Sequence, residues 1–249
     1  MRPRPTSPRR ISAKPSNTRI TLEIDRSIRS PNFGERRDGL RPELVVLHYT
    51  AMQDCAGAAK ALCDPEREVS AHYLIGRDGT VFELVAPEMR AWHAGKGWWQ
   101  GRYDVNSRSI GIELDNDGRT PFSAPLMASL ERLLPRLLSD HGIAPEGVIG
   151  HSDMAPGRKI DPGARFDWKR LARSGLSVWS EAAGDAVDAD AFRRDATAFG
   201  YGEMDDALLL EVVRMRFRPW ARGPLDGTDC ARMADLAQRF GLDPGAACA

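Results

Sequence analysis

One stretch rich in glycine and proline carries the residues best suited to chemistry. Residues 150–163 read Gly-His-Ser-Asp-Met-Ala-Pro-Gly-Arg-Lys-Ile-Asp-Pro-Gly, a composition that favours a loop over a helix or a strand. Within it, His151 offers an imidazole, Asp161 a carboxylate and Lys159 a cation. A catalytic zinc site is built from three such imidazole, thiolate or carboxylate ligands and one open position. The stretch therefore predicts a catalytic zinc site that lacks one protein ligand.

Two histidines are placed where strands are expected to end. His48 follows the apolar run 44–47, which is typical of a strand buried on both faces, and His151 follows the short apolar pair 148–149. Open α/β sheets hold their sites at the ends of such strands. Both positions favour a role in a site over a role in the core.

The other three histidines are less decisive. His141 ends a predicted helix, where the helix dipole favours a cation, so a structural role fits it best. His72 lies in a predicted strand among apolar neighbours, and a hydrogen-bonded core histidine and a functional one are both open. His93 lies in the aromatic, glycine-rich segment 91–99, which is suited to the wall of a site for a sugar or a peptide.

The elements around these residues predict an α/β domain. Residues 109–114 alternate, with apolar side chains on one face and Glu113 on the other, so Glu113 points away from the apolar face of its strand. A hairpin is predicted over 69–75 and 80–85, because an Asp-Gly turn lies between two β-rich runs. Helices are predicted over 55–62 and 123–141, and three more follow beyond residue 188.

Composition limits the domains, the compartment and the partners. The chain has 249 residues, and its 35 basic and 35 acidic residues cancel, which argues against a nucleic-acid partner. We expect an extended basic arm (1–17), a catalytic domain (18–178) and a three-helix domain (188–243). No apolar run resembles a membrane span or a signal peptide, so a cytoplasmic location is expected, with the cell envelope as the alternative. The four cysteines are expected to be reduced.

Three separated segments resemble a known family. Val46-Leu-His48-Tyr-Thr, Ser109-Ile-Gly-Ile-Glu113-Leu and residues 150–163 are similar, in this order, to the signature segments of the type-2 N-acetylmuramoyl-L-alanine amidases. That zinc family includes phage amidase lysozymes, cell-wall recycling amidases and peptidoglycan recognition proteins. The resemblance covers about residues 40–170 and implies a mixed central β-sheet flanked by helices.

The resemblance also implies a role for each matching residue. His48, His151 and Asp161 would bind Zn²⁺, which agrees with the count of three protein ligands and one open position. Glu113 would accept a proton from the attacking water, and Lys159 would stabilise the oxyanion of the tetrahedral intermediate. The amide bond cut would join the lactyl group of N-acetylmuramic acid to the L-alanine of the stem peptide.

Further expectations concern substrate contacts and the C-terminal segment. Candidates for contacting the substrate are Trp92, His93, Asn116, Arg108 and Arg158, and either Arg108 or Arg158 could hold a peptide carboxylate. The C-terminal helices resemble the peptidoglycan-binding module of some envelope amidases. Expected ligands are muropeptides, with the 1,6-anhydro form, intact wall and the oligomeric state left open. Because some relatives bind peptidoglycan without cutting it, a binding-only protein is the alternative, although every catalytic position here is filled.

Overall fold

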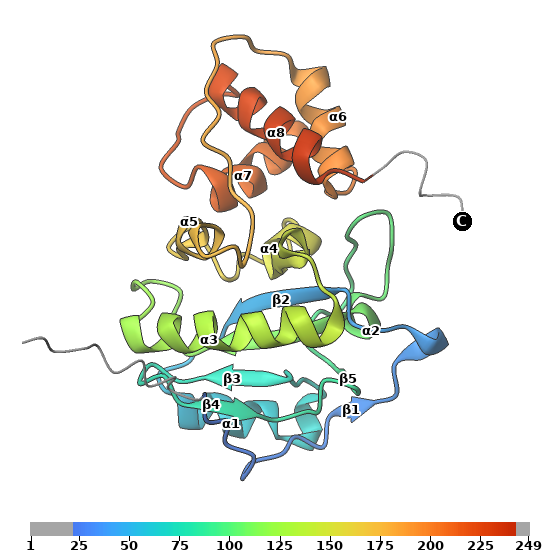
Figure 1. The fold of residues 1–249 in the computed structure, drawn as a ribbon, viewed down its shortest axis with the longest axis vertical. Coiled ribbons are helices and arrows are strands. Elements are labelled where there is room, and N and C mark those ends of the chain that lie inside the picture. The colour runs from blue at the N-terminus through green and yellow to red at the C-terminus, as the bar shows by residue number, and fades with distance from the viewer. Residues whose placement is uncertain (1–21, 243–249) are drawn as a thin grey trace, which may run out of the picture.

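A mixed sheet of five strands positions the predicted site residues (Figure 1). The computed structural model describes residues 22–242, so the predicted basic arm lies outside the described residues. The strands, in spatial order, are β4 (Val81–Glu83), β3 (Tyr73–Ile75), β6 (Ser109–Leu114), β2 (Leu44–Tyr49) and β7 (Val148–Gly150). β3, β6, β2 and β7 run parallel, and β4 pairs antiparallel to β3. The mixed α/β fold is therefore confirmed.

The register of the parallel strands brings the motifs together. His48 of β2 lies beside Glu113 of β6, and Leu47 lies beside Gly150 of β7. Three separated motifs thus end at one edge of the sheet, because neighbouring parallel strands present their carboxyl ends on the same side. The continuous apolar run of β2 is fully buried, as the sequence predicted for a central strand.

One face of the sheet packs against α3 (Ala124–His141). Its leucines share a hydrophobic cluster with Val45 and Leu47 of β2 and with the apolar residues of β6. As predicted, Ser123 caps the helix and Gly142 ends it, with φ of +66°. Because side chains alternate along a strand, His48 and Glu113 lie on the opposite face, away from α3.

Shorter elements complete this half of the chain. The hairpin forms, with strands shorter than predicted, and α1 (Cys55–Leu62) begins after its predicted cap, Asp54. The remaining elements are β1 (Phe33–Gly34), paired with β5 (Arg90–Ala91), the helices α2 (Val105–Arg108) and α5 (Trp168–Arg173), and the 3₁₀ turns η1 (Arg37–Gly39), η2 (Pro65–Arg67) and η3 (Pro145–Gly147). Cys55, Cys63 and Cys230 are free thiols.

The prediction that residues 150–163 form only a loop is wrong at its beginning. A single helical turn, α4 (His151–Met154), follows β7 directly. Gly150 is its N-cap, and Asp153 accepts a hydrogen bond from the Gly150 N–H at 2.7 Å. A carboxylate three residues after the cap is a helix-start signal that the overall composition of the stretch conceals.

The three predicted C-terminal helices are present as α6 (Ala189–Phe199), α7 (Asp206–Phe217) and α8 (Gly227–Phe240). In Figure 1, α4 and α5 lie between them and the sheet. One hydrophobic cluster joins Val46 and Ile149 of the sheet and Trp99 to Phe199 and Phe217 of these helices. The domain boundaries stay a prediction, as does peptidoglycan binding by these helices, but the two segments share a core. No helix within residues 22–242 is long and apolar enough to cross a membrane.

Candidate metal centre and active site

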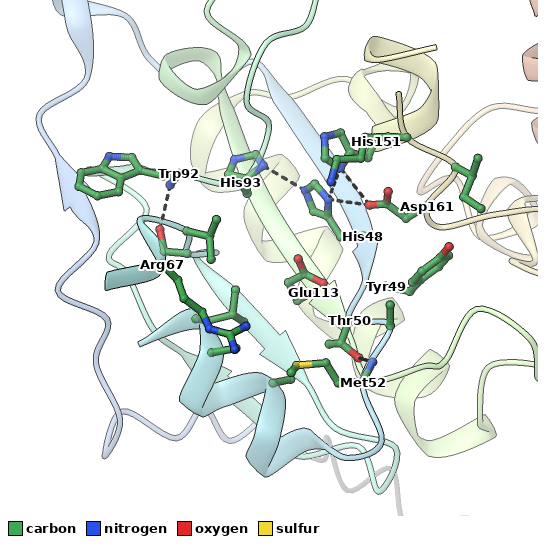
Figure 2. Close-up of a pocket in the computed structure, with 18 of the residues that line it drawn as sticks. His48, Tyr49, Thr50, Met52, Arg67, Trp92, His93, Glu113, His151 and Asp161 are labelled. Carbon is green, nitrogen blue, oxygen red and sulfur yellow. Dashed lines mark hydrogen bonds and ion pairs between the residues drawn. The ribbon is translucent and has the colours of Figure 1, made fainter. Parts of the chain in front are cut away.

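The three predicted metal ligands meet at the end of the sheet (Figure 2). His48 Nδ1 lies 2.9 Å from His151 Nδ1 and 2.9 Å from an Asp161 carboxylate oxygen, and His151 Nδ1 lies 3.0 Å from that same oxygen. All three residues are buried. Two imidazole nitrogens and one carboxylate oxygen in such a triangle can all contact one metal ion, and they leave a further position open.

The electrostatics of these residues suit a cation. Burial, followed by the neighbouring His151, lowers the pKa of His48 to about 4, so its imidazole is neutral, as a metal ligand must be. Burial alone would raise the pKa of Asp161, but the adjoining imidazoles of His151 and His48 outweigh it and hold that pKa well below its usual range. The site therefore presents a neutral imidazole at His48 and an ionised carboxylate at Asp161, beside the imidazole of His151.

The outer ring nitrogens are also engaged. His151 Nε2 donates to the Ala94 carbonyl at 3.0 Å, which leaves its Nδ1 lone pair free for a metal. His48 Nε2 lies 3.1 Å from Nδ1 of His93, and His93 Nε2 lies 3.2 Å from the Ser109 hydroxyl, which donates to the Val105 carbonyl. Because that hydroxyl proton is already used, His93 Nε2–H donates to Ser109, and His93 Nδ1 accepts from His48 Nε2–H. This chain fixes the tautomer of His48.

Glu113 lies beside this triad on the same face of the sheet (Figure 2). One of its carboxylate oxygens is buried without a hydrogen-bond partner in the described chain. Burial and then the charge of Asp161 raise the pKa of Glu113 to about 8, while the cation of Lys159 opposes them. A desolvated carboxylate whose pKa lies near neutrality is suited to taking up and releasing a proton.

This pKa predicts how pH affects the stability of the metal-free protein. A carboxyl group whose folded pKa is about 8 and whose unfolded pKa is 4.5 holds its proton more tightly in the folded state. Stability therefore falls as pH rises between these values, by on the order of a few kcal/mol. We expect Glu113→Gln, which cannot ionise, to be more stable than wild type at pH 8.5 and similar to it at pH 4.5, as measured by urea unfolding in chelator. If the variant and the wild type were equally stable at pH 8.5 as well as at pH 4.5, the raised pKa of Glu113 would be contradicted.

Lys159 is exposed and lines the same cavity. Its backbone N–H donates to the Ala155 carbonyl at 3.0 Å, so the loop that carries it folds back on the end of α4. The charge of Lys159 lowers the pKa of both His48 and Glu113, so this cation acts on one metal ligand and on the candidate base. A cation there can stabilise negative charge that develops on a substrate oxygen.

A cavity of about 610 Å³ opens over these residues, large enough for a substrate fragment. The metal ligands, Glu113 and Lys159 all line it, as do the predicted wall residues Trp92, His93 and Arg158. Arg158 also donates to the carbonyls of Ala94 and Lys96, so it ties the aromatic loop to the metal loop.

Two predicted substrate contacts lie elsewhere. Arg108 is fully buried, pairs with Glu43 and donates to the carbonyls of Trp99 and Arg102. Asn116 is also buried, and its side chain holds its own turn through contacts with Gly118 and Thr120. Neither residue lines the cavity, so the structure gives both a structural role. Arg108 lies just before the strand that carries Glu113, and Asn116 lies just after it. From such positions alone, the sequence could not show whether a side chain lines the cavity or is buried.

The sequence interpretation missed three contributors. Arg67 lines the cavity and carries an exposed cation. Asn106 accepts hydrogen bonds from the backbone of His93 and Ala94, and so positions the aromatic loop. Gly111 leaves room for the His93 ring, because a Cβ at position 111 would lie 2.4 Å from the imidazole. The glycine between the two isoleucines of this strand was a signal of close approach.

Comparisons with known proteins agree with this geometry. Residues 38–164 match the N-acetylmuramoyl-L-alanine amidase family, Amidase_2. The chain is 31% identical to N-acetylmuramoyl-L-alanine amidase AmiD of Escherichia coli, over 82% of this chain and 85% of that protein. It is 35% identical to 1,6-anhydro-N-acetylmuramyl-L-alanine amidase AmpD of Haemophilus influenzae, over 60% of this chain and 91% of that protein.

Solved structures show the same relationship. AmiD of E. coli, in complex with anhydro-N-acetylmuramic acid-L-Ala-D-γ-Glu-L-Lys, superposes with a TM-score of 0.75 at 29% identity and covers 83% of this chain and 93% of that one. AMPDH3 of Pseudomonas aeruginosa, in complex with anhydromuramic pentapeptide, superposes with a TM-score of 0.72 at 33% identity and covers 89% of this chain and 100% of that one. The fold and the comparisons define a hydrolase of the amidase class, and its site is compatible with a metal ion. The chain belongs to the N-acetylmuramoyl-L-alanine amidase family.

Proposed function

We propose that this protein is a zinc-dependent amidase that hydrolyses the bond between the muramic acid lactyl group and the L-alanine of the stem peptide. The observation that carries the proposal is the triad of His48, His151 and Asp161 in one cavity with Glu113 and Lys159. A ligand set of two imidazole nitrogens and one carboxylate oxygen, with an open position, suits Zn²⁺. When bound, Zn²⁺ supplies a Lewis acid that activates water and polarises the carbonyl.

Three residues of the chain carry out the remaining steps or hold the metal ligand in place. Glu113, as the carboxylate, takes the proton of the attacking water, and in protonated form it can give a proton to the departing L-alanine nitrogen. Lys159 stabilises the oxygen of the tetrahedral intermediate, which becomes negative as the carbonyl is attacked. His93 holds His48 in the tautomer that leaves Nδ1 free. Glu113 and the loop that carries Lys159 reach the cavity from the ends of β6 and β7, and His93 reaches it from the loop after β5.

The proposed substrates are muropeptides, and the proposed process is cell-wall turnover and recycling. AmiD and AMPDH3 were solved with anhydromuramyl peptides, and AmpD is named for the 1,6-anhydro sugar. The cavity suits a stem peptide that carries carboxylates, because the cations of Arg67 and Lys159 both line it. These observations support 1,6-anhydro-muropeptides as the first substrates to test.

The product pattern tests this function. Zinc-loaded protein should be offered an anhydro-muropeptide, its reduced non-anhydro counterpart and intact sacculi in parallel, with products identified by mass spectrometry. We expect cleavage of the anhydro-muropeptide into an intact sugar fragment and an intact stem peptide. Cleavage within the peptide or within the glycan would contradict the proposed bond. Saturable binding of all three ligands without any product would instead favour a binding-only protein.

A further inference from the structure

An arginine from the C-terminal helices reaches the loop that carries a metal ligand. Arg216 of α7 is 2% exposed, and its guanidinium Nη1 lies 2.8 Å from a carboxylate oxygen of Asp153, which is 1% exposed. The guanidinium also lies over the rings of Trp168 and Phe217, at 4.5 and 4.9 Å from their centroids. The pair is therefore held in a fully buried and closely packed position.

Asp153 lies two residues after the ligand His151, and its carboxylate is fully engaged. One oxygen accepts from the Gly150 N–H at 2.7 Å and from Arg216, and the other accepts from the Tyr201 hydroxyl at 2.8 Å. Gly150 immediately precedes His151. The carboxylate thus connects the backbone on one side of the ligand to two side chains of the C-terminal segment.

The same guanidinium also holds the strand that precedes this turn. Arg216 Nη2 donates to the Val148 carbonyl of β7 at 3.0 Å. On the other side of His151, the Ser152 N–H donates to the carbonyl of Asp161 at 2.9 Å. The backbone around His151 is therefore hydrogen-bonded to Asp161, the other ligand of this loop, and to Arg216 of α7.

Stability alone is a weak explanation for this pair. Replacing a buried ion pair by apolar side chains is often neutral or stabilising, so such pairs are better explained by the geometry that they enforce. Metal sites tolerate little displacement of a ligand, and residues that orient ligands from behind contribute strongly to metal affinity.

We propose that Arg216 and Tyr201 are positioning residues of the metal site, which act through Asp153 to hold His151 in place beside His48 and Asp161. The C-terminal helices would then serve the metal site directly, in addition to any contact with peptidoglycan. The inference rests on the proposed Zn²⁺ binding. It assigns a role to residues that touch neither the metal ligands nor the cavity.

The same helix supplies a matched control. Arg214 is 8% exposed and pairs with Asp229, which is 1% exposed, at 2.6 Å. It also donates to the carbonyls of Gly223 and Pro224, so all its partners lie within the C-terminal segment. Removing Arg214 disturbs a comparably buried ion pair without touching the backbone around His151.

The test compares Zn²⁺ affinity in full-length Tyr201→Phe, Arg216→Met and Arg214→Met, by competition with a chromogenic chelator. Circular dichroism and thermal unfolding in chelator record how much each change destabilises the metal-free fold. We expect Arg216→Met to weaken Zn²⁺ binding by about 10- to 100-fold and Tyr201→Phe by a smaller but measurable factor. Arg214→Met should lower the unfolding temperature but keep wild-type affinity. In the Co²⁺-loaded protein, the visible absorption bands should change for the first two variants only.

Each outcome is decisive. If Arg216→Met does not fold, Tyr201→Phe still tests the inference, because it removes one hydroxyl and keeps the ring. Wild-type Zn²⁺ affinity in Tyr201→Phe, or an equal loss in Arg214→Met, would overturn the positioning role while leaving the proposed function intact. A wild-type protein that binds no Zn²⁺ would overturn the proposed function itself and the inference with it.

Discussion

Glu113→Gln is expected to lower kcat for amide cleavage by about 10²- to 10⁴-fold and to keep wild-type Zn²⁺ content. The amide preserves the shape of the side chain but cannot take up the proton of the attacking water. Glu113 lies beside His48 in the register of the sheet but is not part of the ligand triangle, so the metal should stay bound. Steady-state kinetics on an anhydro-muropeptide, together with metal analysis of the same samples, measure both quantities.

Two results would contradict this role of Glu113. Loss of Zn²⁺ from the variant would make Glu113 a ligand, and near-normal kcat would assign the base to another group. Glu43→Gln provides a matched control, because Glu43 pairs with the buried Arg108 outside the cavity. That change should leave kcat within a few-fold of wild type.

Lys159→Ala is expected to lower kcat by about 10²- to 10³-fold, with little change in KM or Zn²⁺ content. The ammonium acts on charge that appears only in the transition state, so its loss should not weaken binding of the neutral amide. Lys96→Ala is the control, because Lys96 is also an exposed lysine near the site but does not line this cavity. It should keep normal kinetics.

A greatly raised KM with near-normal kcat in Lys159→Ala would contradict the proposed role of Lys159 in stabilising the transition state. Lys159 would then be an anchor for a substrate carboxylate, and the oxyanion would need another donor. Arg67 lines the same cavity, so Arg67→Ala should be measured alongside. A change confined to KM in that variant would separate substrate anchoring from catalysis.

The positions of the candidate metal ligand His48 and the candidate base Glu113 were predictable because they follow from local sequence patterns. The buried run before His48 and the alternation around Glu113 predicted strands, and parallel pairing then placed both residues at one edge of the sheet. The helix over 123–141 followed equally well from its spacing and caps. The resemblance to a family supplied the proposed role of each residue, which spacing alone did not.

The supporting residues were not predictable, because they depend on contacts between distant segments. Whether Arg108 faces a cavity or Glu43 depends on tertiary packing that no local pattern encodes. The partnership of His93 with His48 needs the space over Gly111, and that of Arg216 with Asp153 spans 63 positions in the chain. For the same reason, the hydrophobic core shared between the sheet and the C-terminal helices was not visible as a sequence pattern.

The central claim is that a metal held by His48, His151 and Asp161 drives amide cleavage. It is tested most directly by removing Zn²⁺ with a chelator, assaying an anhydro-muropeptide by mass spectrometry, and adding back Zn²⁺. Stripped protein should release no stem peptide, and about one equivalent of Zn²⁺ per chain should restore cleavage of wild type but not of His48→Ala. Full amide cleavage by the stripped wild-type protein, with no zinc found by metal analysis, would contradict the account.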